Sequence, residues 1–128
     1  MAISIYYTAR RKAPLSLNEL AVVEQIVHRH RVEDEIERFL SRRAGLNWES
    51  FDFSTNLESS SFLKKGVVLS GSTKLPDNQE NASWIGVQHW CKCLSELRNS
   101  VPDCEWNVKV EDHEMHWDAS VSAYDPTR

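Results

Sequence analysis

Two segments of the chain alternate apolar and polar residues, which is the pattern of half-buried β-strands, and two more carry clusters of aromatic or β-branched residues. In the first, "ISIYYTAR", Ile3, Ile5 and Tyr7 recur at every second position. A period of two combined with many β-branched and aromatic residues predicts strands. The polar segment 54–65 joins the second strand to the third. The predicted strands are residues 3–10, 47–53, 66–75 and 104–110.

Two longer segments carry an apolar residue at every third or fourth position, as amphipathic helices do. The first helix begins after Ser16, because Ser16 and Glu19 have the spacing of a capping box between flanking leucines. Its apolar stripe shifts around the axis at "HRHR", residues 28–31, so either one helix kinks there or two helices meet. The second helix spans residues 82–101 and is stopped by Pro102.

The order of these elements predicts the fold class α+β with a ferredoxin-like β-α-β-β-α-β topology. In this arrangement, two helices cover one face of a four-stranded antiparallel sheet. The first and third strands are central, the second and fourth lie at the edges, and the first helix is long or broken. A length of 128 residues with 41% hydrophobic residues fits a single domain, residues 1–128.

Charge is unevenly distributed along the chain, whose net charge is −4. Residues 101–128 carry two Lys or Arg against seven Asp or Glu, a net charge of −5. This segment repels phosphate backbones and attracts basic partners at long range. The predicted strand 66–75 also lacks the aromatic residues on which RNA bases stack, so we expect no nucleic-acid partner.

The apolar residues and the cysteines predict a cytoplasmic protein. No apolar stretch approaches the length needed to cross a bilayer, so we expect no membrane partner. At the N-terminus the basic cluster follows the apolar run, which is the reverse of a secretory signal. The chain has an odd number of cysteines, Cys91, Cys93 and Cys104. The side chains of Cys91 and Cys93 point in different directions on a helix, so these two cannot form a disulfide. We therefore expect free thiols in a reducing compartment.

The segment "VEDHEMHWD", residues 110–118, concentrates four carboxylates and two histidines. If the alternation of the strand 104–110 continued, Asp112, Glu114 and His116 would face the core without partners. The alternation must therefore break. We expect a solvated turn at residues 111–114, with "MHW" returning as a short arm.

The two histidines of this segment raise the question of a metal site. Zinc needs three or four converging ligands, whereas His113 and His116 supply two, without the i, i+4 spacing of helical zinc motifs. We predict no cofactor on this ground. The alternative function is a small metal-binding protein or enzyme that uses His113, His116 and neighbouring carboxylates.

Trp117 lies between His116 and Asp118, which is the composition of an interface anchor with a charged rim. The alternative is that its ring only covers the end of the sheet. The predicted partner-binding residues are Glu105, Glu111, Asp112, Glu114, His116, Trp117 and Asp118.

Three other clusters predict structure rather than chemistry. We interpret "HRHR" as a solvated helix surface or a kink, because the following "EDEIE" cancels its charge. The basic cluster Arg10 to Lys12 is interpreted as an exposed connection. In "HWCKC", Cys91 faces the apolar stripe and is interpreted as a buried structural cysteine.

Five segments stand out along the chain: "GLNWESF", "TKLPDN", "WIGVQHWCKCLSELR", "WNVKVEDHEMHWD" and "YDP". They resemble the landmarks of a family of small, uncharacterised bacterial proteins, and this similarity spans most of the chain. The resemblance implies no activity, and it assigns no functional residue. By size, acidity and the absence of a catalytic motif, the chain also resembles in type the immunity proteins that neutralise toxins, often basic nucleases.

We therefore predict a non-enzymatic binding protein, most concretely a cytoplasmic antitoxin or immunity protein. Its acidic C-terminal region would cover the active site or substrate surface of a basic toxin, such as a nuclease. Opposite charges raise the association rate, and buried aromatic contacts lower the dissociation rate. A homodimer formed through exposed sheet edges or the open sheet face is a further alternative.

Overall fold

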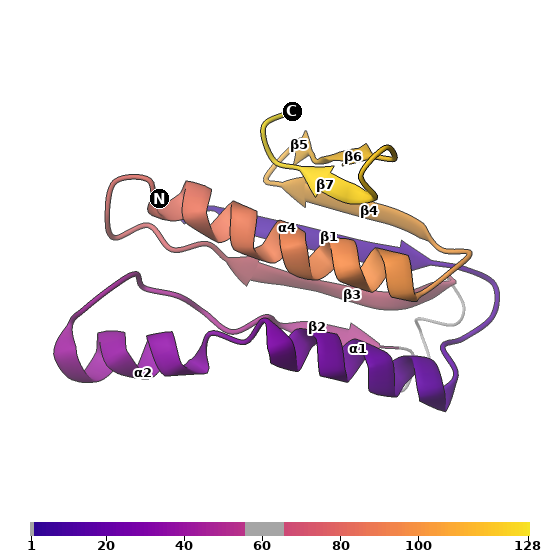
Figure 1. The fold of residues 1–128 in the computed structure, drawn as a ribbon, viewed down its shortest axis with the longest axis horizontal. Helices are drawn as coiled ribbons and strands as arrows, with labels where there is room; N and C mark the ends of the chain where they lie inside the picture. Colours follow the sequence, from indigo (N-terminus) through magenta and orange to yellow (C-terminus); the bar gives the residue numbers. More distant parts are fainter. Residues whose placement is uncertain (1, 56–65) are drawn as a thin grey trace.

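The computed structural model describes residues 2–55 and 66–128. It confirms the α+β class: helices α1 and α4 pack against a mostly antiparallel sheet (Figure 1). The described residues form, in order, β1 (Ser4–Arg10), α1 (Leu17–Arg29), α2 (Glu33–Arg42), β2 (Phe53–Thr55), β3 (Val67–Lys74), α4 (Ala82–Ser100), β4 (Glu105–Val110), β5 (His113–Glu114), β6 (His116–Asp118) and β7 (Ala123–Asp125).

The predicted number of four strands is wrong. Within the described residues, the main sheet has five strands in the order β2-β3-β1-β4-β5, and β6 pairs with β7 in a separate two-stranded sheet. The three extra strands were not predicted because β5 has two residues and β6 and β7 have three each, too few for a visible alternation. β1 lies between β3 and β4 and is antiparallel to both.

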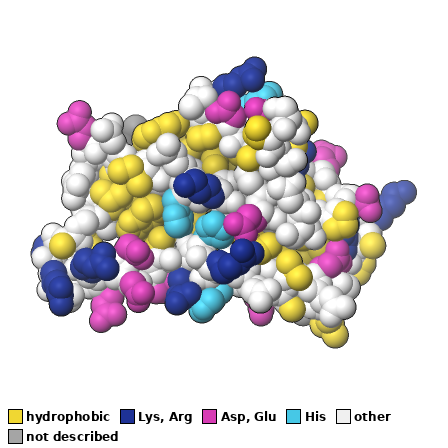
Figure 2. Space-filling view, viewed as in Figure 1, with side chains coloured by type: hydrophobic (Ala, Val, Ile, Leu, Met, Phe, Trp, Pro, Cys, Tyr) yellow, Lys and Arg dark blue, Asp and Glu magenta, His cyan; other side chains and the backbone are white. Residues whose placement is uncertain are grey.

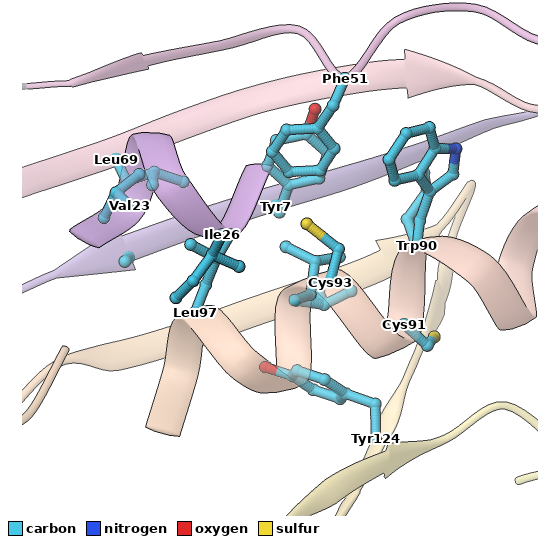
Figure 3. Packing of buried hydrophobic residues seen from close by; sticks show 14 of the residues in the cluster. Tyr7, Val23, Ile26, Phe51, Leu69, Trp90, Cys91, Cys93, Leu97 and Tyr124 are labelled. Atoms are coloured by element: carbon cyan, nitrogen blue, oxygen red, sulfur yellow. The ribbon is translucent and has the colours of Figure 1, made fainter. Parts of the chain in front are cut away.

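One face of the sheet carries the hydrophobic core. Tyr7 of β1 is 1% exposed and lies opposite Gly71 of β3 and Val108 of β4. The Tyr7 ring stacks on Phe51, with ring centroids 4.4 Å apart, and Trp90 of α4 packs beside Phe51 (Figure 3). A Cβ on Gly71 would come within 2.7 Å of the Tyr7 ring, so this position requires glycine.

The Tyr7 hydroxyl forms a buried hydrogen-bond network at the β2 side of the core. It donates to the Asp52 carbonyl oxygen at 2.5 Å and lies 2.7 Å from Thr73 Oγ1. The backbone N–H of Asp52 in turn donates to Thr73 Oγ1 at 3.2 Å. Burial, the largest cause, raises the Tyr7 pKa, so its hydroxyl stays protonated as a donor.

The helical segment 17–42 is bent, and it divides into α1 and α2 at residues 30–32. The predicted capping box is present, since Ser16 Oγ accepts from the Glu19 N–H and the Glu19 carboxylate accepts from the Ser16 N–H. On α4, Trp84 fits the apolar spacing that predicts this helix and its buried stripe, but it is 41% exposed. Its place is near the start of the helix, where the sheet no longer lies beneath it (Figure 1).

The Arg11 side chain is a structural link rather than part of an exposed connection, so that prediction is wrong for this residue. Its guanidinium donates to the carbonyl oxygens of Ala13, Pro14 and Pro102 at 2.8, 3.0 and 3.1 Å. It also pairs with both carboxylate oxygens of Glu19, at 2.9 and 2.5 Å. All five N–H groups therefore have acceptors, which join three segments of the chain.

The predicted strand 47–53 is mostly wrong, because β2 begins only at Phe53. Residues 47–52 do not pair with β3 as a strand. Their polar groups form hydrogen bonds with side chains of other segments instead. The Asn47 amide, for example, donates to Asp77 Oδ1 at 2.8 Å. Of the predicted polar connection 54–65, residues 56–65 lie outside the described part of the chain.

Candidate binding surface

The acidic segment after β4 folds back on that strand as a tight hairpin. The turn consists of Glu111 and Asp112, and it is flanked by the pair Val110 and His113. Glu111 has φ of 53°, a left-handed conformation that reverses the chain in two residues. The expected turn at residues 111–114 is thus present but shorter, since residues 113–114 form β5. We call residues 105–114 the acidic hairpin.

The carboxylates of the acidic hairpin are exposed, and two of them are held in place by hydrogen bonds. Glu111 Oε2 accepts from the Ser4 N–H at 3.0 Å, and the Glu111 N–H donates to the Ser4 carbonyl at 3.1 Å. Glu114 Oε1 accepts from the Asn107 amide at 3.0 Å and lies opposite Lys109. The hairpin has four carboxylates and one lysine, hence a net charge of −3. The carboxylates of Glu111 and Glu114 are thus oriented before any partner arrives.

The predicted binding residues do not form one compact patch. Glu105 lies at the start of β4, opposite Arg10 of β1, whereas Glu111 and Asp112 lie beyond its end. Glu105 and Val110 are five residue steps apart along the strand, which corresponds to roughly 17 Å. The acidic residues therefore follow an elongated edge of the molecule.

The remaining predicted residues belong to a second feature, the arm formed by β6 and β7. Trp117 is half-buried: its ring meets Tyr124 edge-on at 5.0 Å, and the Arg98 guanidinium lies 4.1 Å from its centroid. Arg98 also donates to the Tyr124 hydroxyl at 3.3 Å. These contacts fix the arm on the C-terminal half of α4, so the Trp117 ring serves at least as a packing element.

His116 and Asp118 lie on the side of the arm opposite Trp117, where His116 is exposed and Asp118 is half-buried. His116 pairs in register with Asp125, while Asp118 Oδ1 accepts from the N–H and the hydroxyl of Ser120 at 3.0 and 2.6 Å. These hydrogen bonds are the main reason that the Asp118 pKa is lowered. The arm thus adds an ionised carboxylate to the acidic surface.

Metal-binding geometry is not found in the described part of the chain, where no three His, Cys, Asp or Glu side chains are placed to hold an ion. The Nε2 atom of His113 lies 3.1 Å from the Arg128 carbonyl oxygen, which points to a hydrogen bond rather than a free ligand. Burial raises the pKa values of Cys91 and Cys93 to about 12, so both remain thiols.

A polar cluster that the sequence did not predict lies at the α1–α2 junction. His30 Nε2 is 2.9 Å from Glu96 Oε1, and His89 Nε2 is 2.7 Å from the His30 carbonyl oxygen. His30 and Glu96 also line a groove of about 500 Å³ between α4 and β7. The signal in the sequence was "HRHR" at the phase shift, but its partners lie about 60 residues away and could not be identified.

The chain matches no protein family, no curated protein and no solved structure. The resemblance to small bacterial proteins therefore stays a prediction. In residues 2–55 and 66–128, no helix combines the length and apolar character that crossing a membrane requires.

Proposed function

We propose that this protein is a non-enzymatic binding protein of the cytoplasm, most concretely an immunity protein or antitoxin. Its partner would be a basic toxin domain, such as a nuclease, held against the acidic hairpin and the side of the arm that carries His116 and Asp118. The observation that carries the proposal is the set of exposed carboxylates fixed by Ser4 and Asn107. Fixed charges lose little side-chain freedom when they meet a cationic surface.

The charge distribution and the thiols support this proposal. Residues 101–128 carry a net charge of −5, which would accelerate association with a basic partner through long-range attraction. All three cysteines lie in the described part of the chain and are free, as expected in a reducing compartment. The structure holds Trp117 against α4, so any aromatic contact with the partner would use its exposed edge.

The topology also supports a finer classification as ferredoxin-like. The order β2-β3-β1-β4 within the larger sheet is the one expected of a split βαβ fold, to which β5 and the arm would be additions. Such a fold leaves the outer strand and its hairpin accessible to a partner, which is where the acidic residues lie.

Affinity capture with charge-reversal variants tests the proposal. The test variant carries Glu105→Lys, Asp112→Lys and Glu114→Lys, and it keeps Glu111 because that residue holds β1. A matched control reverses three exposed carboxylates on the helices and has the same net charge. The control carries Glu24→Lys, Asp34→Lys and Glu37→Lys.

Each protein is used as bait in a lysate of its native host at low and moderate salt, and the retained proteins are identified by mass spectrometry. We expect the wild type and the helix control to retain the same basic protein in near-equal amount, and the hairpin variant to lose it. Equal retention by the hairpin variant would exclude this surface. Failure of the wild type to retain any basic protein would count against the function itself.

A further inference from the structure

Two histidines join the α1–α2 junction to α4. His89 of α4 contacts the carbonyl oxygen of His30, the C-cap residue of α1, through Nε2 at 2.7 Å. A carbonyl only accepts, so His89 Nε2 carries the proton and Nδ1 carries the lone pair of the neutral ring. The His30 imidazole reaches back to Glu96 Oε1 at 2.9 Å, and Arg29 Nη2 lies 2.9 Å from the other carboxylate oxygen.

The His89 ring is enclosed mainly by aromatic rings. Trp48 and Trp90 meet it edge-on, with centroid distances of 5.1 and 4.6 Å, and the His30 ring lies 5.9 Å away. Trp90 is fully buried, so water cannot solvate the His89 ring from that side. A second proton on this ring would therefore place a charge in a poorly solvated position. Histidines gather with acidic and basic side chains over the middle of this face (Figure 2).

The element beyond the junction, α2, is held weakly. None of its ten residues, Glu33–Arg42, is fully buried, and Figure 1 shows it extending away from the sheet. The junction itself is anchored, because Val32 is only 2% exposed. A helix with few buried apolar contacts opens at low free-energy cost. α2 is held by the packing of Ile36 on the core, by the hydrogen bond from Ser50 Oγ to Glu33 and by the contacts at the junction, so loosening the junction removes a substantial part of its support.

We propose that His89 and the carbonyl oxygen of His30 form a pH-sensitive latch, which holds the α1–α2 junction on α4 at neutral pH and weakens as the solution becomes acidic. In the closed state, burial keeps the His89 pKa below the ordinary 6.5. Release returns the ring to water and to its ordinary pKa. Protons thus bind the released state more tightly, so the latch is fully formed above pH 6.5 and weakens as the pH falls through and below that value.

Charged groups on each neighbouring element modulate the latch. The His30 ring of α1 and Lys92 of α4 oppose a charge on His89, whereas Glu35 of α2 favours it. Glu96 is engaged by its partners on α1 and does not contact His89. Desolvation has the largest effect on the His89 pKa and lowers it. The latch is therefore favoured at neutral pH and disfavoured in acid.

Amide hydrogen exchange at pH 7.5 and 5.5 tests the latch in the full chain. We expect protection of the α2 amides to fall severalfold at the lower pH, after correction for intrinsic exchange, while the β1 amides keep theirs. His89→Gln should remove this pH dependence, because its amide can still donate to the His30 carbonyl but does not titrate. His28→Gln, an exposed change on α1, is the matched control and should behave like the wild type.

Two results would overturn the proposal: equal α2 protection at both pH values in the wild type, or an unchanged pH dependence in His89→Gln. An NMR titration of the wild-type His89 ring decides the matter even if the variant folds poorly. A His89 pKa clearly below 6.5 supports the latch, and a value at or above 6.5 contradicts it.

Discussion

Arg11→Gln removes a guanidinium that joins the β1–α1 connection, the first turn of α1 and the α4–β4 connection. Glutamine has two N–H donors instead of five and a shorter reach, so the carbonyl oxygens and the Glu19 carboxylate lose most of their partners. We expect the variant to fold but to be clearly less stable than the wild type.

The magnitude follows from the contacts. Two of the lost hydrogen bonds are charge-assisted, worth about 1.5–3 kcal/mol each, and the three bonds to carbonyls are worth about 1 kcal/mol each. Their sum is an upper bound, because the carbonyls can regain water and the Arg11 and Glu19 side chains are 11% and 22% exposed. We expect a loss of about 2–4 kcal/mol in the free energy of unfolding, a large share of a typical domain's stability.

The same contact predicts an acid dependence of stability. Hydrogen bonding from Arg11 is the main cause that lowers the Glu19 pKa from 4.5 to about 2. A depressed carboxylate pKa contributes stability that is fully present above 4.5 and is lost as the pH falls through about 2. In Arg11→Gln the Glu19 pKa should rise towards 4.5, so this contribution to the acid dependence should shrink.

Urea denaturation followed by tryptophan fluorescence, at pH 7 and at about pH 3, measures both effects. Lys12→Gln removes the adjacent exposed charge and is the control, with an expected change within about 0.5 kcal/mol. The reasoning is refuted if Arg11→Gln also stays within about 0.5 kcal/mol of the wild type at pH 7.

Three further substitutions test the packing. Gly86→Ala should lower the melting temperature, with a loss of about 1–3 kcal/mol, because the new Cβ would lie 2.6 Å from Pro76 Cδ; a higher melting temperature would contradict this. Tyr7→Phe removes the donor to the Asp52 carbonyl oxygen and one of the two partners of Thr73 Oγ1, and should cost about 1–2 kcal/mol in urea denaturation, whereas an unchanged midpoint would show that the network adds no stability. Arg98→Met removes the cation over Trp117 and should cost about 0.5–1 kcal/mol, seen as faster amide exchange in β7; unchanged exchange would refute that role.

The parts of the fold that were predictable depend on local signals. The capping box at Ser16 determines the start of α1, and Pro102 follows closely after the end of α4. The start of α1 and the end of α4 were therefore found from the sequence alone. β1 and β4 were found because their alternation is regular over six or seven residues. The break between α1 and α2 was visible as a phase shift, although the choice between a kink and two helices required the structure.

The remaining features depend on contacts between distant parts of the chain. Arg11 bonds to Pro102 across 91 positions, and the His30 side chain bonds to Glu96 across 66, so no local pattern could pair them. The acidic residues were recognised as solvated, but their separation along β4 and the docking of Trp117 follow from strand pairing. Sequence reasoning thus found the charged groups of the candidate site without their arrangement.

The association rate between this protein and its captured partner, measured by stopped flow from about 50 to 300 mM salt, tests the proposed function most directly. The account predicts a rate that falls steeply with salt for the wild type and for the helix control. The variant with Glu105→Lys, Asp112→Lys and Glu114→Lys should associate slowly at all salt concentrations, without that decline. If the hairpin variant instead matched the wild type in both rate and salt dependence, the acidic hairpin would not be the binding surface.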